Sequence, residues 1–114
     1  MPLFLFVESK VMHAPKNWDE FVDYIHQAVY EVDELKTCFE EDDEEMEHYL
    51  TFLDPLDIQL RKLYDDVISG RYEYSRDEDL PFMAVVNRWG RHIPFRALLL
   101  AINEAHRDGL KPAQ

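Results

Sequence analysis

The chain has 114 residues, 46% of them hydrophobic and 13% aromatic, and its formal net charge at pH 7 is −12. This apolar fraction is too high for a disordered acidic chain, so we expect one folded acidic domain over residues 1–114 with a frayed tail at 110–114. The negative charge opposes direct binding to nucleic acid and to anionic membranes.

The acidic residues are concentrated in the first half of the chain. Residues 1–57 contain 16 acidic and 3 basic residues, whereas residues 58–114 contain 8 acidic and 9 basic residues. We therefore expect an electrically polar molecule whose acidic end attracts a basic protein surface over a distance.

Cysteine content and hydropathy bear on the compartment. Cys38 is the only cysteine, which favours a reducing environment because no internal disulfide can form. The longest apolar runs, at residues 3–7 and 97–102, are far shorter than the roughly 20 residues that span a bilayer, and no secretory signal is recognisable. These features predict a cytoplasmic protein.

The first elements in chain order differ in clarity. Residues 2–8 fit either a buried strand or a helix that Pro2 opens. A long amphipathic helix then runs from Trp18 to about Phe39, with Asn17 as N-cap and Glu20 completing a pattern like a capping box. Its apolar positions repeat at helical spacing and predict the buried face: Trp18, Phe21, Val22, Ile25, Val29, Val32 and Phe39.

An acid run follows, from Glu40 to Glu47, and leaves open whether the chain continues as helix or loop. Like charges four residues apart favour a break near residues 40–43, with a short helix then reaching Leu53. Asp54-Pro55 predicts the start of a separate third helix, which carries its stripe of Leu56, Leu60, Leu63, Tyr64 and Val67 and ends at Gly70.

The last third of the chain predicts two more helices. Residues 82–89 fit a helix, although a strand paired with residues 3–7 competes, and Tyr72 and Tyr74 leave room for a short edge strand. A final helix begins at Pro94 and ends at Gly109. We therefore predict a mainly α fold, a compact bundle of four to five helices; the alternative is an α+β fold with a small β element from residues 3–8 and 71–89.

Two histidine motifs suggest a metal site. Glu45-x-x-His48 has the spacing of di-iron helical bundles, and Asp23-x-x-His26 resembles it. On a helical wheel Asp23 and His48 point away from the apolar face, so we expect surface charge and no metal or other cofactor. His106, by contrast, falls on the apolar face of the last helix and is expected to be a hydrogen-bonded core residue.

Catalytic motifs are weak throughout the sequence. No nucleophile elbow or phosphate-binding glycine loop is present, and Cys38 lies beside acids, which do not activate a thiol. We therefore expect a protein that is not an enzyme.

Two groups of residues remain as candidate binding sites. The acid run offers a surface for a basic protein partner through Glu40, Glu41, Asp42, Asp43, Glu44, Glu45 and Glu47, with Asp33, Glu34, Asp54 and Asp57 as possible neighbours. The alternative is a small-ligand or anion site formed by Arg88, Trp89, Arg91, His92 and Arg96. A metal-dependent helical bundle is the third hypothesis.

Nuclease-immunity proteins and nucleic-acid mimics share this acidic, helical character, but the likeness is one of composition and carries no residue correspondence. The leading hypothesis is therefore an acidic interaction or regulatory domain. Neither the partner nor the oligomeric state follows from the sequence.

Overall fold

The computed structural model describes residues 13–38, 44–75 and 78–109, with residues 44–46 described by their backbone alone. In these ranges the chain forms helices α2 (Trp18–Thr37), α3 (Glu44–Ile68), α4 (Met83–Trp89) and α5 (Arg96–Asp108), with a short 3-10 helix η1 (Gly90–His92) between α4 and α5. The mainly α prediction is confirmed. The proposed β element is not formed by residues 71–75 or 78–89, and residues 3–8 lie outside the described ranges.

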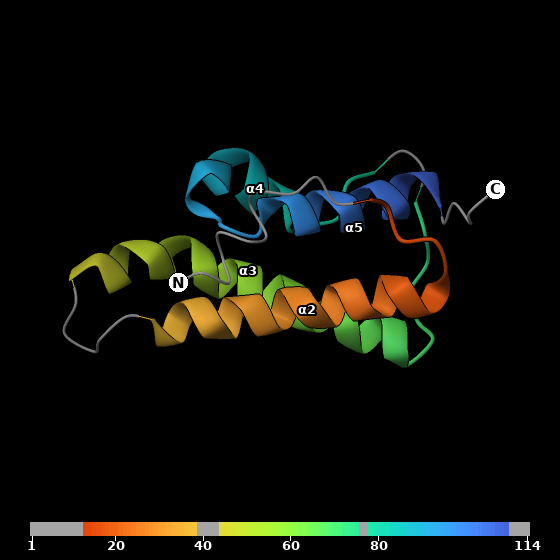
Figure 1. Ribbon diagram of the computed structural model, residues 1–114, viewed down its shortest axis with the longest axis horizontal. Helices are drawn as coiled ribbons and strands as arrows, with labels where there is room; N and C mark the ends of the chain where they lie inside the picture. The colour runs from red at the N-terminus through yellow and green to blue at the C-terminus, as the bar shows by residue number, and fades with distance from the viewer. Residues whose placement is uncertain (1–12, 39–43, 76–77, 110–114) are drawn as a thin grey trace.

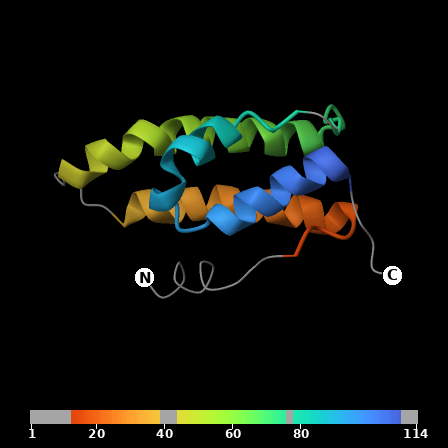
Figure 2. The same cartoon turned by 90° about the horizontal axis from the view of Figure 1, so that it is seen from above.

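The two long helices form one layer of the molecule. Helices α2 and α3 run antiparallel along each other, and α4, η1 and α5 lie across one face of this pair (Figures 1 and 2). The core lies between the two layers, where four phenylalanines are completely or almost completely buried: Phe21, Phe52, Phe82 and Phe95.

Helix α2 begins as its sequence predicts. The side chain of Asn17 accepts a hydrogen bond from the backbone N–H of Glu20 at 2.9 Å. Glu20 in turn accepts from the backbone N–H of Lys16 at 3.0 Å, one residue earlier than in a standard capping box. This backbone hydrogen bond lowers the pKa of Glu20, and the contact of the Glu20 carboxylate with His13 lowers that pKa further.

Helix α3 corrects the prediction for Asp54-Pro55. The chain does not begin a new helix there, because α3 continues without interruption from Glu44 to Ile68 and Pro55 lies inside it. The apolar residues on both sides of the proline, Phe52, Leu53 and Leu56, are completely buried. Their burial outweighs the one backbone hydrogen bond that a proline removes from a helix.

Replacement of Pro55 by alanine is expected to raise the free energy of unfolding by about 1–2 kcal/mol. Alanine restores the N–H that can donate to the carbonyl of Thr51 and removes the clash of the ring with that carbonyl, and the smaller entropy of the proline-containing unfolded chain offsets part of the gain. Urea unfolding measures the change. Pro81→Ala, at an exposed proline outside the helices, serves as the control and should give no such gain; an unchanged or lower stability of Pro55→Ala would contradict the prediction.

The other helix ends follow their local sequence. Gly70 has a positive φ of 83°, and the hydrogen bonds from Gly70 N to Val67 O and from Arg71 N to Asp66 O complete a Schellman motif. Gly109 ends α5 with a positive φ of 79° and an extended ψ of 176°. These are the positions where glycine is required, since other residues rarely adopt such angles.

The predicted buried faces are largely confirmed. Phe21, Ile25 and Val32 of α2 and most of the α3 stripe are buried, as are Leu98, Leu99, Ile102 and Ala105 of α5. Val22, Val29 and Tyr64 are half-buried, and Phe39 lies outside the described residues. Trp18 differs most from the prediction, because 42% of its surface is exposed. It lies at the first residue of α2, where its ring contacts Phe21 and Tyr72, so it covers the edge of the core without entering it.

None of the helices in the described ranges is long and apolar enough to cross a membrane.

Candidate functional site

The acid run lies only partly in the described ranges. Residues 40–43 are outside them, and Glu44 and Glu45 belong to the first turn of α3, where the backbone alone is described. Glu47 is exposed on α3. The predicted break before the second helix is consistent with α3 beginning at Glu44.

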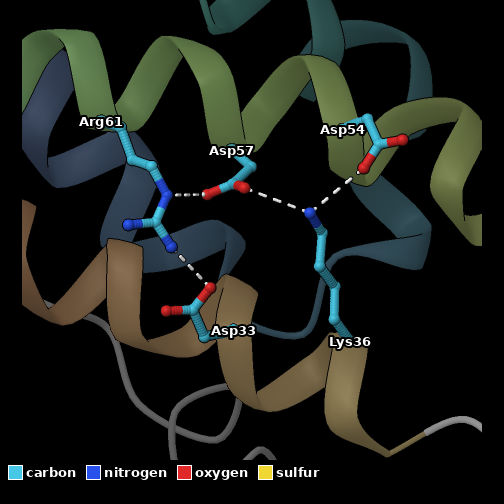
Figure 3. A network of polar contacts seen from close by, with 5 residues as sticks. All are labelled: Asp33, Lys36, Asp54, Asp57 and Arg61. Atoms are coloured by element: carbon cyan, nitrogen blue, oxygen red, sulfur yellow. Dashed lines mark hydrogen bonds and ion pairs between the residues drawn. The ribbon is translucent and has the colours of Figure 1, made fainter.

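Three acids that the sequence placed beside this run are not free charges. Lys36 of α2 lies 3.1 Å from carboxylate oxygens of both Asp54 and Asp57 of α3. Arg61 pairs with Asp57 and with Asp33 at 2.7 Å each. Figure 3 shows these five residues as one chain of contacts across the two helices. Asp33, Asp54 and Asp57 are therefore paired within the molecule, where three carboxylates share two cations and keep a net charge of −1. That these acids extend the acidic binding surface stays a prediction.

The network also joins the two long helices. Burial alone would lower the pKa of Lys36, but the hydrogen bonds from its ammonium group to Asp54 and Asp57 raise that pKa overall. Lys36 and Arg61 are the basic residues that bracket the acid run in the sequence, since no lysine or arginine lies between them. Both are paired with acids outside the run.

The predicted arginine cluster, Arg88, Trp89, Arg91, His92 and Arg96, spans α4, η1 and the start of α5. Its charged residues are exposed, whereas Trp89 is half-buried and packs against the core. The Arg88 guanidinium lies 5.5 Å from the centroid of the Trp89 ring, which is cation–π distance. Arg96 lies over buried Gly90, where an added Cβ would come within 3.1 Å of its Cδ.

The structure adds His48 of α3 to this cluster. The centroid of its ring is 5.6 Å from that of Trp89 and 5.7 Å from that of His92. The Phe52 ring stacks on the Trp89 ring, with their centroids 5.4 Å apart. The helical wheel placed His48 away from the apolar face, which is correct, since it is exposed. Its contact with η1 depends on how α3 and α4 pack, and no local signal in the sequence indicates it.

The arginines of the cluster do not pair with the acidic surface in the described part of the chain. No ion pair joins Arg88, Arg91 or Arg96 to an acid there. Glu47, the last residue of the acid run, directly precedes His48 in the sequence.

The two histidine motifs lie on different helices, α2 and α3. Asp23 and His26 are exposed on α2, as the wheel predicts. Within the described ranges, no group of three or more His, Cys, Asp or Glu side chains is placed to hold a metal ion. His106 points inward: it is only 6% exposed, and its Nδ1 is hydrogen-bonded to the Tyr72 hydroxyl, which confirms the prediction of a hydrogen-bonded core histidine.

A cavity that sequence reasoning did not find lies beside this histidine. It has a volume of about 200 Å³ and is bounded by the second half of α3, residues 71–73 and 80–82, and His106 of α5. The alternation of Tyr72 and Tyr74 leaves room for a short edge strand, but in the structure both rings pack on Phe21. This cavity depends on contacts between residues more than thirty positions apart, such as Tyr72 and His106. A sequence pattern could not reveal it.

No protein-family model, curated protein or solved structure matches this chain.

Proposed function

We propose that this protein is a non-enzymatic interaction or regulatory domain that binds a basic surface of another protein through the acid run, Glu40–Glu47. Seven of the eight residues in this run are acidic. The observation that carries the proposal is the pairing of Lys36 and Arg61 with Asp33, Asp54 and Asp57. The basic residues nearest in sequence are thereby paired with acids outside the run, which supports a run whose charge attracts a partner.

The physical consequence is fast, salt-sensitive association. A dense negative surface attracts a basic protein before contact, and this attraction weakens as ionic strength rises, because the Debye length falls from about 30 Å at 0.01 M salt to about 8 Å at 0.15 M. The second half of the run, from residue 44, belongs to α3, which packs along α2.

A second candidate function is anion binding by the arginine cluster. Its support is the absence of ion pairs between Arg88, Arg91 or Arg96 and any acid in the described part of the chain. Guanidinium groups beside an aromatic ring suit carboxylate or phosphate recognition.

One set of variants separates the two functions. The first variant neutralises the acid run at four positions: Glu40→Gln, Glu41→Gln, Asp42→Asn and Asp43→Asn. The matched control removes the same number and kind of charges from exposed positions without a described ion pair: Asp19→Asn, Asp23→Asn, Glu73→Gln and Glu104→Gln. A third variant, Arg91→Ala, removes one member of the arginine cluster.

The measurement is capture of partners from a native lysate on the immobilised protein, elution by a salt gradient, and calorimetric titration of the captured protein. We expect a basic partner that elutes at low salt and binds the first variant at least roughly tenfold more weakly than the control. Equal binding by these two variants would refute the acid run as the binding surface. Loss of binding in Arg91→Ala alone, together with saturable binding of inorganic phosphate by the unaltered protein, would support the second function instead.

A further inference from the structure

The cavity beside His106 has apolar walls of suitable size for a small ring. Leu63, Leu80 and Phe82 line it, each less than a tenth exposed. Its volume is about 200 Å³, and an apolar cavity of about 150 Å³ in a protein interior is known to accept benzene. A benzene ring with one small substituent therefore fits this space.

The polar part of the cavity is the pair formed by Tyr72 and His106. The Tyr72 hydroxyl and His106 Nδ1 are 2.6 Å apart. Burial raises the pKa of Tyr72, so the phenol keeps its proton, and burial lowers the pKa of His106, so the imidazole is neutral. A phenol hydroxyl is a stronger donor than acceptor, which favours the tautomer whose Nδ1 accepts from Tyr72 and whose proton is on Nε2, and the proposal below is for that tautomer.

The Nε2–H group of His106 has no hydrogen-bond acceptor among the described residues. The fully buried side-chain atom without a partner in these ranges is Glu31 Oε1, and His106 Nε2 is not among such atoms. His106 Nε2 therefore keeps some contact with solvent, and His106 is a lining residue of the cavity. A donor fixed by its hydrogen bond to Tyr72 is ready for an acceptor on a ligand.

The charged residues around the cavity balance one another. Lys62 pairs with Asp66 at 2.9 Å, and Arg71 pairs with Asp65 and Asp66. With Glu73, the ionised lining residues comprise two cations and two anions. A charged ligand would have to displace one of these pairs, so the cavity favours a neutral molecule.

We propose that this cavity binds a small neutral aromatic molecule with one hydrogen-bond acceptor, which the Nε2–H of His106 recognises while Leu63, Leu80 and Phe82 enclose the ring. None of the residues that line the cavity belongs to the acid run or to the arginine cluster. The proposal therefore stands or fails independently of the proposed function.

Acetophenone tests the proposal, because its carbonyl oxygen is an acceptor on a ring of suitable size. Nitrogen-15 and backbone amide spectra of the full chain, recorded up to about 10 mM acetophenone, should show saturable shifts at His106 Nε2 and at residues 71–73 and 80–82. Dissociation constants near 1 mM are expected for a ligand of this size. Cumene, which has the same shape without the carbonyl oxygen, should bind more weakly and leave His106 Nε2 unshifted.

His106→Phe tests the hydrogen bond, and it should weaken acetophenone binding about three- to tenfold. His26→Phe, at an exposed histidine outside the cavity, is the control and should bind as the unaltered protein does. If His106→Phe does not fold, the shift of His106 Nε2 in the unaltered protein decides the matter. Absence of saturable shifts at His106 Nε2, or equal binding of acetophenone and cumene, would overturn the proposal.

Discussion

Replacement of Asn103 by leucine is expected to lower the free energy of unfolding by about 2–3 kcal/mol. Asn103 is a buried polar residue of α5, 7% exposed, and its Oδ1 accepts a hydrogen bond from the backbone N–H of Leu80 at 2.8 Å. Its Nδ2 donates to Asp79 at 3.0 Å, and this hydrogen bond is the largest cause of the lowered pKa of Asp79. The Asn103 side chain thus fixes residues 79–80, which lead into α4.

Leucine has the same branching and number of side-chain heavy atoms as asparagine, although its methyl groups are bulkier, and it neither accepts nor donates a hydrogen bond. The Leu80 N–H would then be buried without a partner, which is the costly part of the change, whereas the exposed Asp79 can be solvated. Urea unfolding measures the loss. Asn87→Leu, on the exposed face of α4, is the matched control and should change stability by less than about 0.5 kcal/mol. Equal stabilities of the two variants would show that Asn103 is not needed to hold residues 79–80.

Asn103→Asp separates the two hydrogen bonds. The aspartate can still accept from Leu80, but it places a second carboxylate beside Asp79, so the folded-state pKa of the new residue rises above its unfolded value of about 3.9. A raised folded pKa contributes stability that is complete below the unfolded pKa and is lost as pH rises through the folded pKa. The variant should therefore recover stability relative to the unaltered protein on acidification, which urea unfolding between pH 3 and pH 7 would show.

The sequence predicted best those features that depend on near neighbours in the chain. Three such features are present in the structure: the cap at Asn17, the positive φ angles at Gly70 and Gly109, and the apolar face of α5. Each arises from residues within two or three helical turns. The helical spacing of Phe82, Val85 and Val86 also predicted α4 correctly, although the same residues fit a strand.

The errors have a common physical origin, because each concerns a local signal that long-range packing overrides. Asp54-Pro55 is a good helix start by itself, but burial of Phe52, Leu53 and Leu56 against the rest of the core keeps α3 continuous. Trp18 belongs to the apolar face of α2 by its spacing, but it lies at the end of the helix, where the second layer covers less of it.

The candidate sites were predicted less well than the fold. The sequence predicted the arginine cluster as far as His92 and Arg96, because these residues are near neighbours in the chain. It did not predict that His48 joins them, because that contact arises from the packing of α3. The pairing of Asp33 with Arg61 and that of Tyr72 with His106 likewise join distant positions. Such pairs decide which charges are free and which side chains line a cavity, so the functional surfaces depend on tertiary structure.

Glu31 is a buried acid whose removal is expected to stabilise the protein. Its side chain in α2 is completely buried. Oε2 accepts a hydrogen bond from Gln27 at 2.7 Å, but Oε1 has no partner. Burial raises the pKa of Glu31; the hydrogen bond from Gln27 lowers it, and the nearby Glu34 carboxylate raises it. Ionisation of Glu31 is therefore costly in the folded state.

Methionine has a similar length and no charge, and Gln27 is exposed enough to bind water in place of the lost acceptor. We expect Glu31→Met to raise the free energy of unfolding at pH 7 by about 2 kcal/mol, within the range seen when buried charged groups are replaced by apolar ones. Glu34→Met, one turn along the same helix and half-buried, is the control and should give a much smaller change.

The pH dependence distinguishes a buried charge from a simple packing effect. Because the folded pKa of Glu31 is raised, its contribution to stability is complete below the unfolded pKa of about 4.3 and is lost as pH rises through the folded value. The advantage of Glu31→Met should therefore be largest at pH 7 and above and should shrink towards pH 4. Urea unfolding of both proteins across this range tests it, and a variant less stable than the unaltered protein at pH 7 would mean that the carboxylate is better satisfied than its contacts with Gln27 indicate.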